Sequence, residues 1–343
     1  MSYIVGFGEI MLRLSAPGNE RLLQSPILET VIGGGEANVC VSCSRFGLPS
    51  RYLTALPKNA LGEKTEELLN GQKVDTSAIA WCGERLGIYF VEKGSNQRGS
   101  TVLYDRANSS IAEAKTSDFN WKDAFDNAHW LHISGITPAL TQSAADLTLE
   151  VVKQAKKYGL KISCDLNFRK KLWNYGKKSS EIMPEIVKYV DVLIANEEDI
   201  QLSLGIPLST DVTKGHLKVE DYIPLLKTVM EKYPHLEGIA TTLRESISAN
   251  HNDWLALYYA QETLYVSKKY EITDIVDRVG GGDSFAAGLI SGLHFFPESL
   301  QQSLEFAVAA SCLKHTIPGD WNLISKKEVM NLMSGDGSGR VQR

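Results

Sequence analysis

Apolar and polar residues follow two different rhythms along the chain, and these rhythms alternate. Short apolar runs of the kind found in buried strands occur at 3–8, 130–134, 161–165, 191–195 and 238–243. Longer segments with apolar residues every three or four positions predict helices at 36–46, 61–69, 142–158, 180–189, 219–233, 283–292 and 298–314. Alternating strands and helices are typical of a parallel sheet with helices on both faces, so the pattern predicts an α/β fold.

Two segments interrupt this alternation and predict a small β-module that projects from the main sheet. Residues 11–15 alternate apolar and polar side chains, and residues 86–104 contain two strand-like runs around the turn-rich segment 94–99. No repeat or low-complexity block divides the sequence, so we expect residues 1–343 to form one domain. The Gly- and Ser-rich residues 334–343 predict a flexible tail.

Composition and charge narrow the possible classes of protein. The 343 residues include 36 Lys and Arg against 41 Asp and Glu, and the net charge of −5 argues against nucleic-acid binding. No apolar run approaches the ~20 residues of a membrane span, and the first residues lack the pattern of a signal peptide. Five thinly spread cysteines, an odd number, favour a reducing, cytoplasmic setting.

The strongest candidate for chemistry is a run of three glycines, Gly280, Gly281 and Gly282, followed by Asp283 at the start of an apolar helix. Glycine N–H groups at a helix N-terminus can converge on an anion, because no side chains shield them and the helix dipole favours negative charge. A carboxylate beside a bound phosphate is well explained as a base that takes a proton from an attacking hydroxyl. The alternative is an ordinary glycine turn with Asp283 as N-cap.

A second glycine-rich segment opens the helix predicted at 36–46. Gly34 and Gly35 would let a ligand approach the backbone, and Asn38 offers two hydrogen-bond donors and an acceptor. The alternative is a tight turn before a helix. The earlier segment 6–11 resembles a dinucleotide fingerprint but lacks the third glycine, so we reject it as a cofactor motif, which disfavours a dehydrogenase.

Together, segments 33–38 and 280–283 resemble the two signatures of the ribokinase-like (PfkB) carbohydrate kinases, and the resemblance covers nearly the whole chain. It implies a three-layer α/β/α sandwich with a mainly parallel sheet and a small β-sheet lid, here at about 10–16 and 85–106. It also implies ATP as phosphoryl donor with Mg²⁺, Gly280 to Gly282 as an anion hole, and Asp283 as general base.

The resemblance further implies a nucleotide side of the site. Asn196 and Asp199 occupy the family's N-x-x-E motif for magnesium and phosphate, with Asp199 in place of the usual Glu and a shorter reach. After the strand at 238–243 the family has a glycine-containing turn, whereas this chain has Thr242, Leu243 and Arg244. Thr242 and Arg244 are therefore candidates for nucleotide binding, together with Asn196, Gly280 and Gly282.

Segments 131–140 and 164–173 resemble those of 2-keto-3-deoxygluconate kinases, which phosphorylate the 6-hydroxyl of a sugar acid. A sugar acid needs a cation in its pocket, and a guanidinium matches a carboxylate bidentately. The substrate-binding candidates that this resemblance implies are Gly34, Gly35, Asn38, Tyr89, Tyr104, Arg106 and Arg169. Arg169 follows a predicted parallel strand, where α/β sheets bind ligands.

Several alternatives remain open on the sequence. Tyr89 and Tyr104 could be packing residues and Arg106 a surface charge, which would suit a kinase for a neutral ketose such as fructose. A non-catalytic sugar-acid sensor on the same scaffold is a further alternative. His132, between two apolar residues on a strand, is interpreted as a core residue.

The remaining expectations concern assembly and details of the site. The exposed face of the lid sheet would suit a homodimer or higher homo-oligomer, because small isolated sheets are marginally stable. Residues 207–233 predict an extra surface helix of unassigned role. The sequence leaves open the gluconate or galactonate epimer, the oligomer size, and a monovalent-cation site near Asp277 and Val279 that some relatives have.

Overall fold

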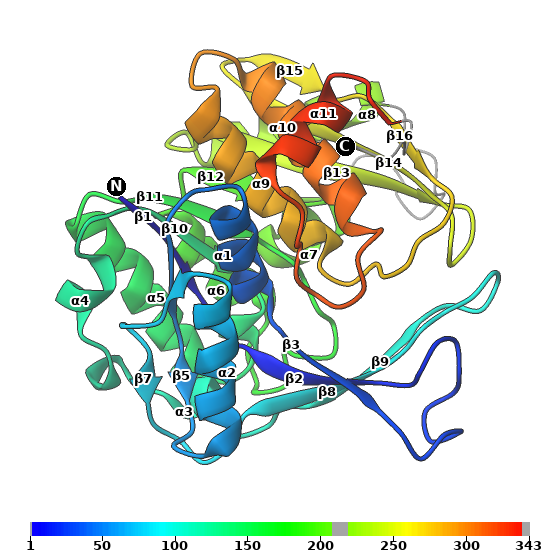
Figure 1. Ribbon diagram of the computed structural model, residues 1–343. Helices are drawn as coiled ribbons and strands as arrows, with labels where there is room; N and C mark the ends of the chain where they lie inside the picture. Colours follow the sequence, from blue (N-terminus) through cyan, green and yellow to red (C-terminus); the bar gives the residue numbers. More distant parts are fainter. Residues whose placement is uncertain (1, 208–218, 338–343) are drawn as a thin grey trace.

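The structure is a computed structural model that describes residues 2–207 and 219–337. Its centre is a ten-stranded sheet in the order β15-β14-β13-β12-β11-β10-β1-β4-β6, with β16 paired to β14 (Figure 1). The strands from β6 to β13 in this order run parallel, whereas β14, β15 and β16 form an antiparallel edge. The strands are β1 (Tyr3–Phe7), β4 (Ser50–Leu53), β6 (Val74–Asp75), β10 (Ala128–Ser134), β11 (Lys161–Asp165), β12 (Val192–Ile194), β13 (Gly238–Ser246), β14 (Asn252–Ala260), β15 (Thr263–Val266) and β16 (Tyr270–Ile272).

Helices cover both faces of this sheet, as the alternating pattern predicted. One apolar core packs α5, α6, α7 and α8 against the sheet, and a second packs α1, α9, α10 and α11 against the opposite face. The central strands are buried on both sides, which explains why they are continuous apolar runs in the sequence. The helices are α1 (Gly35–Arg45), α2 (Ala60–Gly71), α3 (Ser110–Glu113), α4 (Trp121–Phe125), α5 (Gln142–Lys157), α6 (Ser179–Val187), α7 (Glu197–Leu204), α8 (Val219–Lys232), α9 (Gly281–Phe295), α10 (Leu300–Lys314) and α11 (Lys326–Met333).

A separate four-stranded sheet, in the order β3-β2-β8-β9, projects from the body and is called the lid sheet below (Figure 1). Its strands are β2 (Met11–Ser15), β3 (Glu29–Gly33), β8 (Gly87–Glu92) and β9 (Thr101–Asp105). Strand β2 alternates buried and half-buried residues, as expected when one sheet face is covered. A two-stranded pair, β5 (Ala55–Leu56) and β7 (Ala80–Trp81), lies apart from both sheets.

The predicted α/β class and small β-module are confirmed, with three additions. Strand β3 completes the lid sheet, β13 continues to Ser246, and the antiparallel edge of β14 to β16 follows it. The helix predicted at 219–233 is α8, while residues 208–218 and the tail residues 338–343 lie outside the described residues. Within the described chain, no helix is both long and apolar enough to cross a membrane.

His132, interpreted from the sequence as a core residue, and two cysteines belong to the buried interior. His132 is buried in β10, and its Nδ1 lies 2.8 Å from the Ser163 hydroxyl. Burial lowers the pKa of His132 to about 3, so the ring is neutral. Cys40 and Cys43 are buried on α1, where they pack as small apolar residues.

Candidate active site

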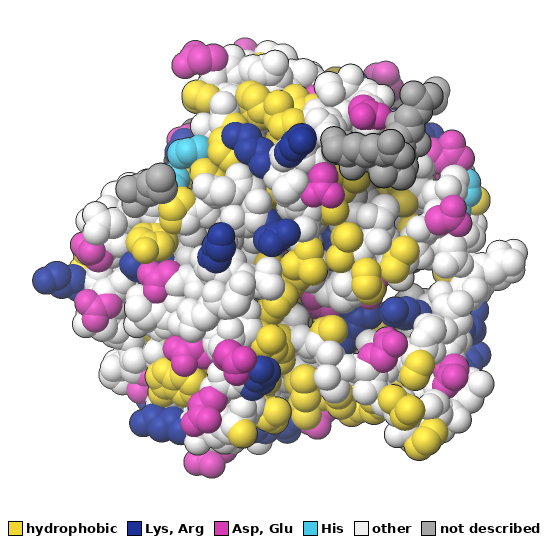
Figure 2. Space-filling model, in the orientation of Figure 1, with side chains coloured by type: hydrophobic (Ala, Val, Ile, Leu, Met, Phe, Trp, Pro, Cys, Tyr) yellow, Lys and Arg dark blue, Asp and Glu magenta, His cyan; other side chains and the backbone are white. Residues whose placement is uncertain are grey.

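A cleft of about 1190 Å³ lies between the main sheet and the lid sheet. Its walls include the chain that follows β11 and β12, the far part of β13, the lid strands β8 and β9, and the N-termini of α1 and α9. The space-filling view shows the surface hollowed beside the lid sheet, with charged side chains in the hollow (Figure 2). The carboxyl ends of parallel strands meet at one edge of a sheet, which is why these segments converge.

The two glycine-rich motifs meet at one wall of this cleft. The Asn38 side-chain nitrogen donates a hydrogen bond to Asp283 Oδ2 over 2.7 Å, although the two residues are 245 positions apart. The backbone of Gly35 lies so close that an added Cβ would be 3.6 Å from Asp283 Oδ1. The N-termini of α1 and α9 therefore face the same small volume, with Asp283 between them.

The space around the backbone differs among the three glycines before Asp283. Gly280 has a left-handed φ of 82°, and an added Cβ would lie 2.1 Å from the Asp320 carbonyl oxygen. A Cβ on Gly281 would lie 2.8 Å from the His315 ring, whereas Gly282 has open space around it. The first two positions are thus dictated by close packing, and the third faces the cleft.

Asp283 combines partial burial with a single strong hydrogen bond. Burial raises the pKa of Asp283 to about 6, with the Asp320 charge adding to the rise and the Asn38 hydrogen bond opposing it. The carboxyl is therefore mostly ionised at pH 7 but titrates close to neutrality. This is the range in which a carboxylate can accept a proton and release it again.

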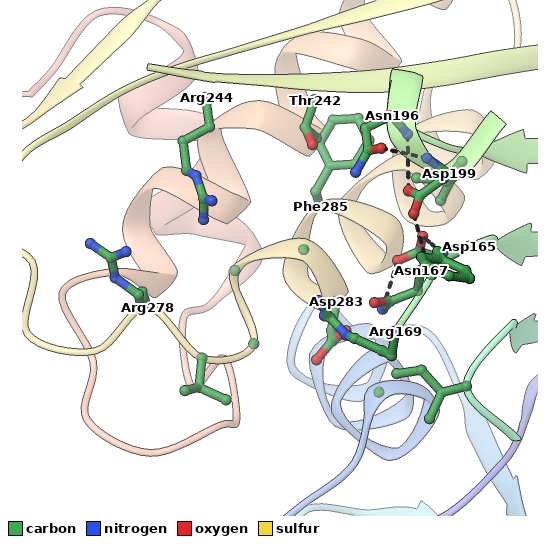
Figure 3. A pocket seen from close by; sticks show the side chains of 18 of the residues that line it. Asp165, Asn167, Arg169, Asn196, Asp199, Thr242, Arg244, Arg278, Asp283 and Phe285 are labelled. Atoms are coloured by element: carbon green, nitrogen blue, oxygen red, sulfur yellow. Dashed lines mark hydrogen bonds between the residues drawn. The ribbon is translucent and has the colours of Figure 1, made fainter. Parts of the chain in front are cut away.

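Arg169 lies on the chain after β11, on the side of the cleft that holds Asp283 (Figure 3). Its exposed guanidinium is close enough to lower the pKa of Asp165, Asp199 and Asp283, although burial raises all three more strongly. Asp165 was missed by the sequence interpretation. It ends β11 within the quoted segment 164–173, and burial followed by the charges of Asp199 and Asp283 raises its pKa well above the usual value.

Asn196 and Asp199 cap α7 reciprocally at the cleft wall. Asn196 Oδ1 accepts the Asp199 backbone N–H over 2.8 Å, and Asp199 Oδ2 accepts the Asn196 N–H over 3.1 Å. Asp199 also accepts a second backbone N–H, that of Phe168, at its Oδ1 over 2.8 Å. Within 2–207 and 219–337, no group of three or more His, Cys, Asp or Glu residues could hold a metal ion.

Two arginines line the opposite end of the cleft, beyond Thr242 (Figure 3). Arg244 extends from β13, and Arg278 donates from Nη2 to the Ala249 carbonyl oxygen at 2.5 Å. Partial burial and then the charges of Arg278 and Arg169 lower the pKa of Arg244. Neither arginine forms an ion pair with a described carboxylate. Arg278 was missed, although it belongs to the glycine motif.

The predicted substrate-binding residues of the lid, Tyr89, Tyr104 and Arg106, line the cleft. Two of them, Tyr89 and Arg106, are already hydrogen-bonded to acidic side chains of the protein. Arg106 is buried and donates from Nε to Glu9 Oε2 over 2.7 Å, and a second nitrogen, Nη2, contacts the same oxygen. The Tyr89 hydroxyl donates to Asp320 Oδ2. The Tyr104 ring lies 5.2 Å from the Arg106 guanidinium carbon. Arg106 is thus a buried ion-pair partner of Glu9. The alternative that it is a surface charge, which the sequence left open, is wrong.

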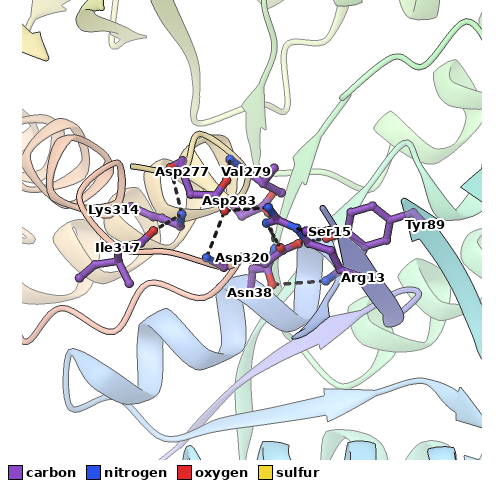
Figure 4. A network of polar contacts seen from close by, with 12 residues as sticks. Arg13, Ser15, Asn38, Tyr89, Asp277, Val279, Asp283, Lys314, Ile317 and Asp320 are labelled. Atoms are coloured by element: carbon purple, nitrogen blue, oxygen red, sulfur yellow. Dashed lines mark hydrogen bonds and ion pairs between the residues drawn. The ribbon is translucent and has the colours of Figure 1, made fainter. Parts of the chain in front are cut away.

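A buried ionic network ties the lid sheet to the loop before the glycine motif at 280–282 (Figure 4). Arg13 of β2 donates to Asp277 Oδ2 and to Asp320 Oδ1, both over 2.8 Å. Burial alone would lower the pKa of Arg13, but the charges of Asp320 and Asp277 outweigh it and raise the pKa. Lys314 lies on the far side of these acids and donates to the backbone oxygens of Asp277 and Ile317.

Comparisons with known proteins agree with this geometry. A family model described as "pfkB family carbohydrate kinase" matches residues 1–326. The chain is 30% identical over 338 residues to a 2-dehydro-3-deoxygalactonokinase of Haloferax volcanii, covering 98% of each protein. It is 25% identical over 323 residues to a 2-dehydro-3-deoxygluconokinase of Thermoproteus tenax, covering 93% of this chain and 90% of the relative.

A solved structure, the 2-dehydro-3-deoxygluconokinase of Thermotoga maritima, is 44% identical with a TM-score of 0.91. The similarity covers 98% of this chain and 100% of that one. The main sheet, its two helical layers and the lid sheet are those of the ribokinase-like fold. The match of the family model over 1–326, on a cleft in which both glycine motifs converge, shows that the chain belongs to the PfkB family of carbohydrate kinases, phosphotransferases with an alcohol group as acceptor.

Proposed function

We propose that the protein is an ATP-dependent kinase for the sugar acid 2-keto-3-deoxy-D-gluconate (2-dehydro-3-deoxy-D-gluconate) and phosphorylates its 6-hydroxyl. The observation that carries the proposal is that Asp283, at the N-terminus of α9, and the exposed cation Arg169 line the same cleft. A substrate with a hydroxyl at one end and a carboxylate at the other would place each group against the matching partner. The names of the relatives in Thermotoga maritima and Thermoproteus tenax support this substrate class.

Asp283 acts as general base in this proposal. The 6-hydroxyl oxygen bonds to the γ-phosphorus, the bond from phosphorus to the bridging oxygen breaks with its electron pair leaving on ADP, and the hydroxyl proton passes to Asp283. Asn38 orients the carboxylate through its hydrogen bond. The proposed anion hole for the charge that develops on the transferred group is formed by the N–H groups at Gly280 to Gly282, of which that of Gly281 also donates to the Arg278 carbonyl oxygen over 3.3 Å.

The substrate carboxylate is assigned mainly to Arg169, because its guanidinium is exposed and Arg106 is paired with Glu9. Arg106 keeps Nη1 for a second contact, since its Nε and Nη2 are engaged with Glu9. Tyr89 and Tyr104 supply aromatic surface along the sugar chain, and the backbones of Gly34 and Gly35 allow its close approach.

The nucleotide is assigned to the end of the cleft lined by Thr242, Arg244 and Arg278. Mg²⁺, when bound, neutralises charge on the β- and γ-phosphates. The oxygen-rich side chains of Asn196 and Asp199 suit this ion, but their capping bonds favour contact through water. The five cysteines carry no disulfide, which supports a reducing, cytoplasmic setting.

The decisive assay measures ADP release with Mg-ATP and 2-keto-3-deoxygluconate, beside its galactonate epimer, fructose and ribose. Turnover confined to the acid sugars supports the proposal. Turnover on fructose would support a sugar kinase but contradict the assignment of Arg169 and Arg106 to a substrate carboxylate. Binding of a sugar acid without turnover would favour a sensor. The galactonate arm is included because the relative in Haloferax volcanii bears that name.

Replacing Arg169 with Ala tests the carboxylate assignment. We expect KM for the sugar acid to rise about 100-fold, because a charge-assisted bidentate contact is lost. We expect kcat to fall by less than about three-fold, because a contact made equally in ground and transition states acts on KM. Lys177→Ala, which removes an exposed charge on the same connection after β11, is the matched control. Equal KM values for the two variants would contradict the assignment.

The outer face of the lid sheet is proposed as the contact between two copies of this chain. Leu12, Leu14, Ile88 and Phe90 lie on one face, opposite the residues that line the cleft, and Leu103 beside Phe90 is 51% exposed. Figure 2 shows hydrophobic side chains on the surface at this end of the molecule. Association would cover an apolar face on a sheet of four short strands.

A further inference from the structure

Lys314 lies directly beneath the anion hole and has no part in the chemistry described above. It is the last residue of α10 and is fully buried. Its Nζ donates to the Asp277 carbonyl oxygen over 3.2 Å and to the Ile317 carbonyl oxygen over 3.1 Å (Figure 4). Its Cε would be 3.3 Å from a Cβ added to Gly280. The ammonium therefore holds the point at which the chain enters the glycine loop.

The environment of this ammonium is unusual for a lysine. A buried charge is costly unless other groups compensate it, and the common partner is a carboxylate in direct contact. Here Arg13 takes both nearby carboxylates, Asp277 and Asp320, at 2.8 Å. No described carboxylate oxygen lies within ion-pair distance of Lys314, so its direct partners are backbone carbonyl oxygens.

Backbone carbonyl oxygens are also the ligands with which proteins replace the water shell of K⁺. The Lys314 ammonium thus contacts two oxygens of the kind that bind a monovalent cation, the carbonyl oxygens of Asp277 and Ile317. The four buried charges balance, with Arg13 and Lys314 against Asp277 and Asp320. Removing the ammonium would leave an excess negative charge below Asp283 and the phosphate-binding N–H groups.

We propose that Lys314 is a built-in cation that positions the anion-hole loop, so that this kinase needs no monovalent metal ion for phosphoryl transfer. It acts through the backbone of Asp277, packs beside Gly280 and does not touch the substrate, so it is a positioning residue. Its charge also favours the ionised form of Asp283, because Lys314 is among the groups that lower the pKa of that carboxyl against the effect of burial.

The test compares the wild type with Lys314→Met, which keeps much of the side-chain volume and removes the charge. Activity and Tm are measured in KCl, NH₄Cl and choline chloride at equal ionic strength, so that screening is constant. We expect wild-type kcat and Tm to be the same in the three salts. We expect kcat of Lys314→Met to fall about 100-fold in choline chloride, the scale of losing one anion-hole donor.

In KCl or NH₄Cl we expect Lys314→Met to regain at least about 10-fold in kcat and to gain Tm, because a small cation can occupy the vacated carbonyl ligands. Lys268→Met is the control, since Lys268 also donates to a backbone carbonyl, that of Met333, but is exposed and away from the cleft. This control should lose little activity and show no preference among the cations.

Three results would overturn the proposal. The first is a wild type that needs K⁺ or NH₄⁺ for turnover or gains Tm from either. The second is a Lys314→Met variant as active as the wild type in choline chloride. The third is a folded Lys314→Met variant with little activity whose kcat and Tm are the same in all three salts. If Lys314→Met fails to fold, the salt series on the wild type still decides. The Tm readings need no substrate, so an error in the proposed sugar acid would appear only in the activity assay.

Discussion

Asp283, the proposed general base, occupies a position that lowers the stability of the folded protein. The carboxylate is held in a partly buried position between two helix N-termini, with Asn38 as its one hydrogen-bond partner among the described residues. Burial raises its pKa to about 6, so the folded protein prefers the protonated form more than the unfolded chain does. Such a group costs stability above its ordinary pKa, and the cost is complete above the folded pKa.

Two measurements follow for this residue. Wild-type kcat/KM should fall as pH drops through about 6, because protonated Asp283 cannot accept the hydroxyl proton. Asp283→Asn should lose several orders of magnitude in kcat, yet its Tm at pH 7 should equal or exceed that of the wild type. The Tm difference should shrink toward pH 4, where the wild-type carboxyl is also neutral. A variant markedly less stable at pH 7 would contradict this account of the pKa.

The sequence was informative about residues whose type and spacing carry the chemistry, and less so about their partners. The two glycine motifs indicated Asn38 and Asp283 separately, and the structure adds the 2.7 Å bond between them. The pair of Arg106 with Glu9 joins residues 97 positions apart. Such a pairing depends on how the lid sheet packs on the body, which no local pattern encodes.

Among the elements, α9 is the one whose first turn holds the proposed base and the proposed anion hole. Gly280→Ala should abolish activity and lower Tm, because the residue has a left-handed φ and its Cβ would overlap the Asp320 carbonyl oxygen. Gly282→Ala should fold with an unchanged or higher Tm, because its Cβ meets nothing within 4 Å and alanine favours a helix. The methyl group would nevertheless face the anion hole and lower kcat. Equal Tm values for the two variants would contradict the packing argument.

The elements that the sequence predicted best are those with strong periodicity or continuous apolar character. The central parallel strands and long helices belong to this group, since burial on fixed faces sets their patterns. Strand β3 is short, with two of its five residues exposed, and the antiparallel edge depends on pairing of β14 with β13. Their positions arise from sheet assembly and leave little local signal.

For the whole molecule, the prediction to test is the proposed assembly of two copies through the lid sheet. Phe90→Asp places a charge on the outer lid face without touching the cleft, and we expect the mass in solution to fall from a dimer or larger oligomer to a monomer. Analytical ultracentrifugation across a concentration series measures this. Leu202→Asp, an exposed apolar position on α7 outside the lid, is the matched control and should leave the mass unchanged. A monomeric wild type would rule out the lid contact.

The network around Arg13 also has a consequence for synthesis on the ribosome. Arg13 and Asp320 are 307 residues apart, and Asn38 and Asp283 are 245 apart. A nascent chain emerges from its N-terminus. Strand β2 therefore leaves the exit tunnel well before the acidic partners of Arg13, Asp277 and Asp320, have been synthesised. A chain that ends before residue 277 therefore lacks the proposed base, the proposed anion hole and both acidic partners of Arg13. Termination within this range would yield a chain that cannot carry out the phosphoryl transfer proposed above.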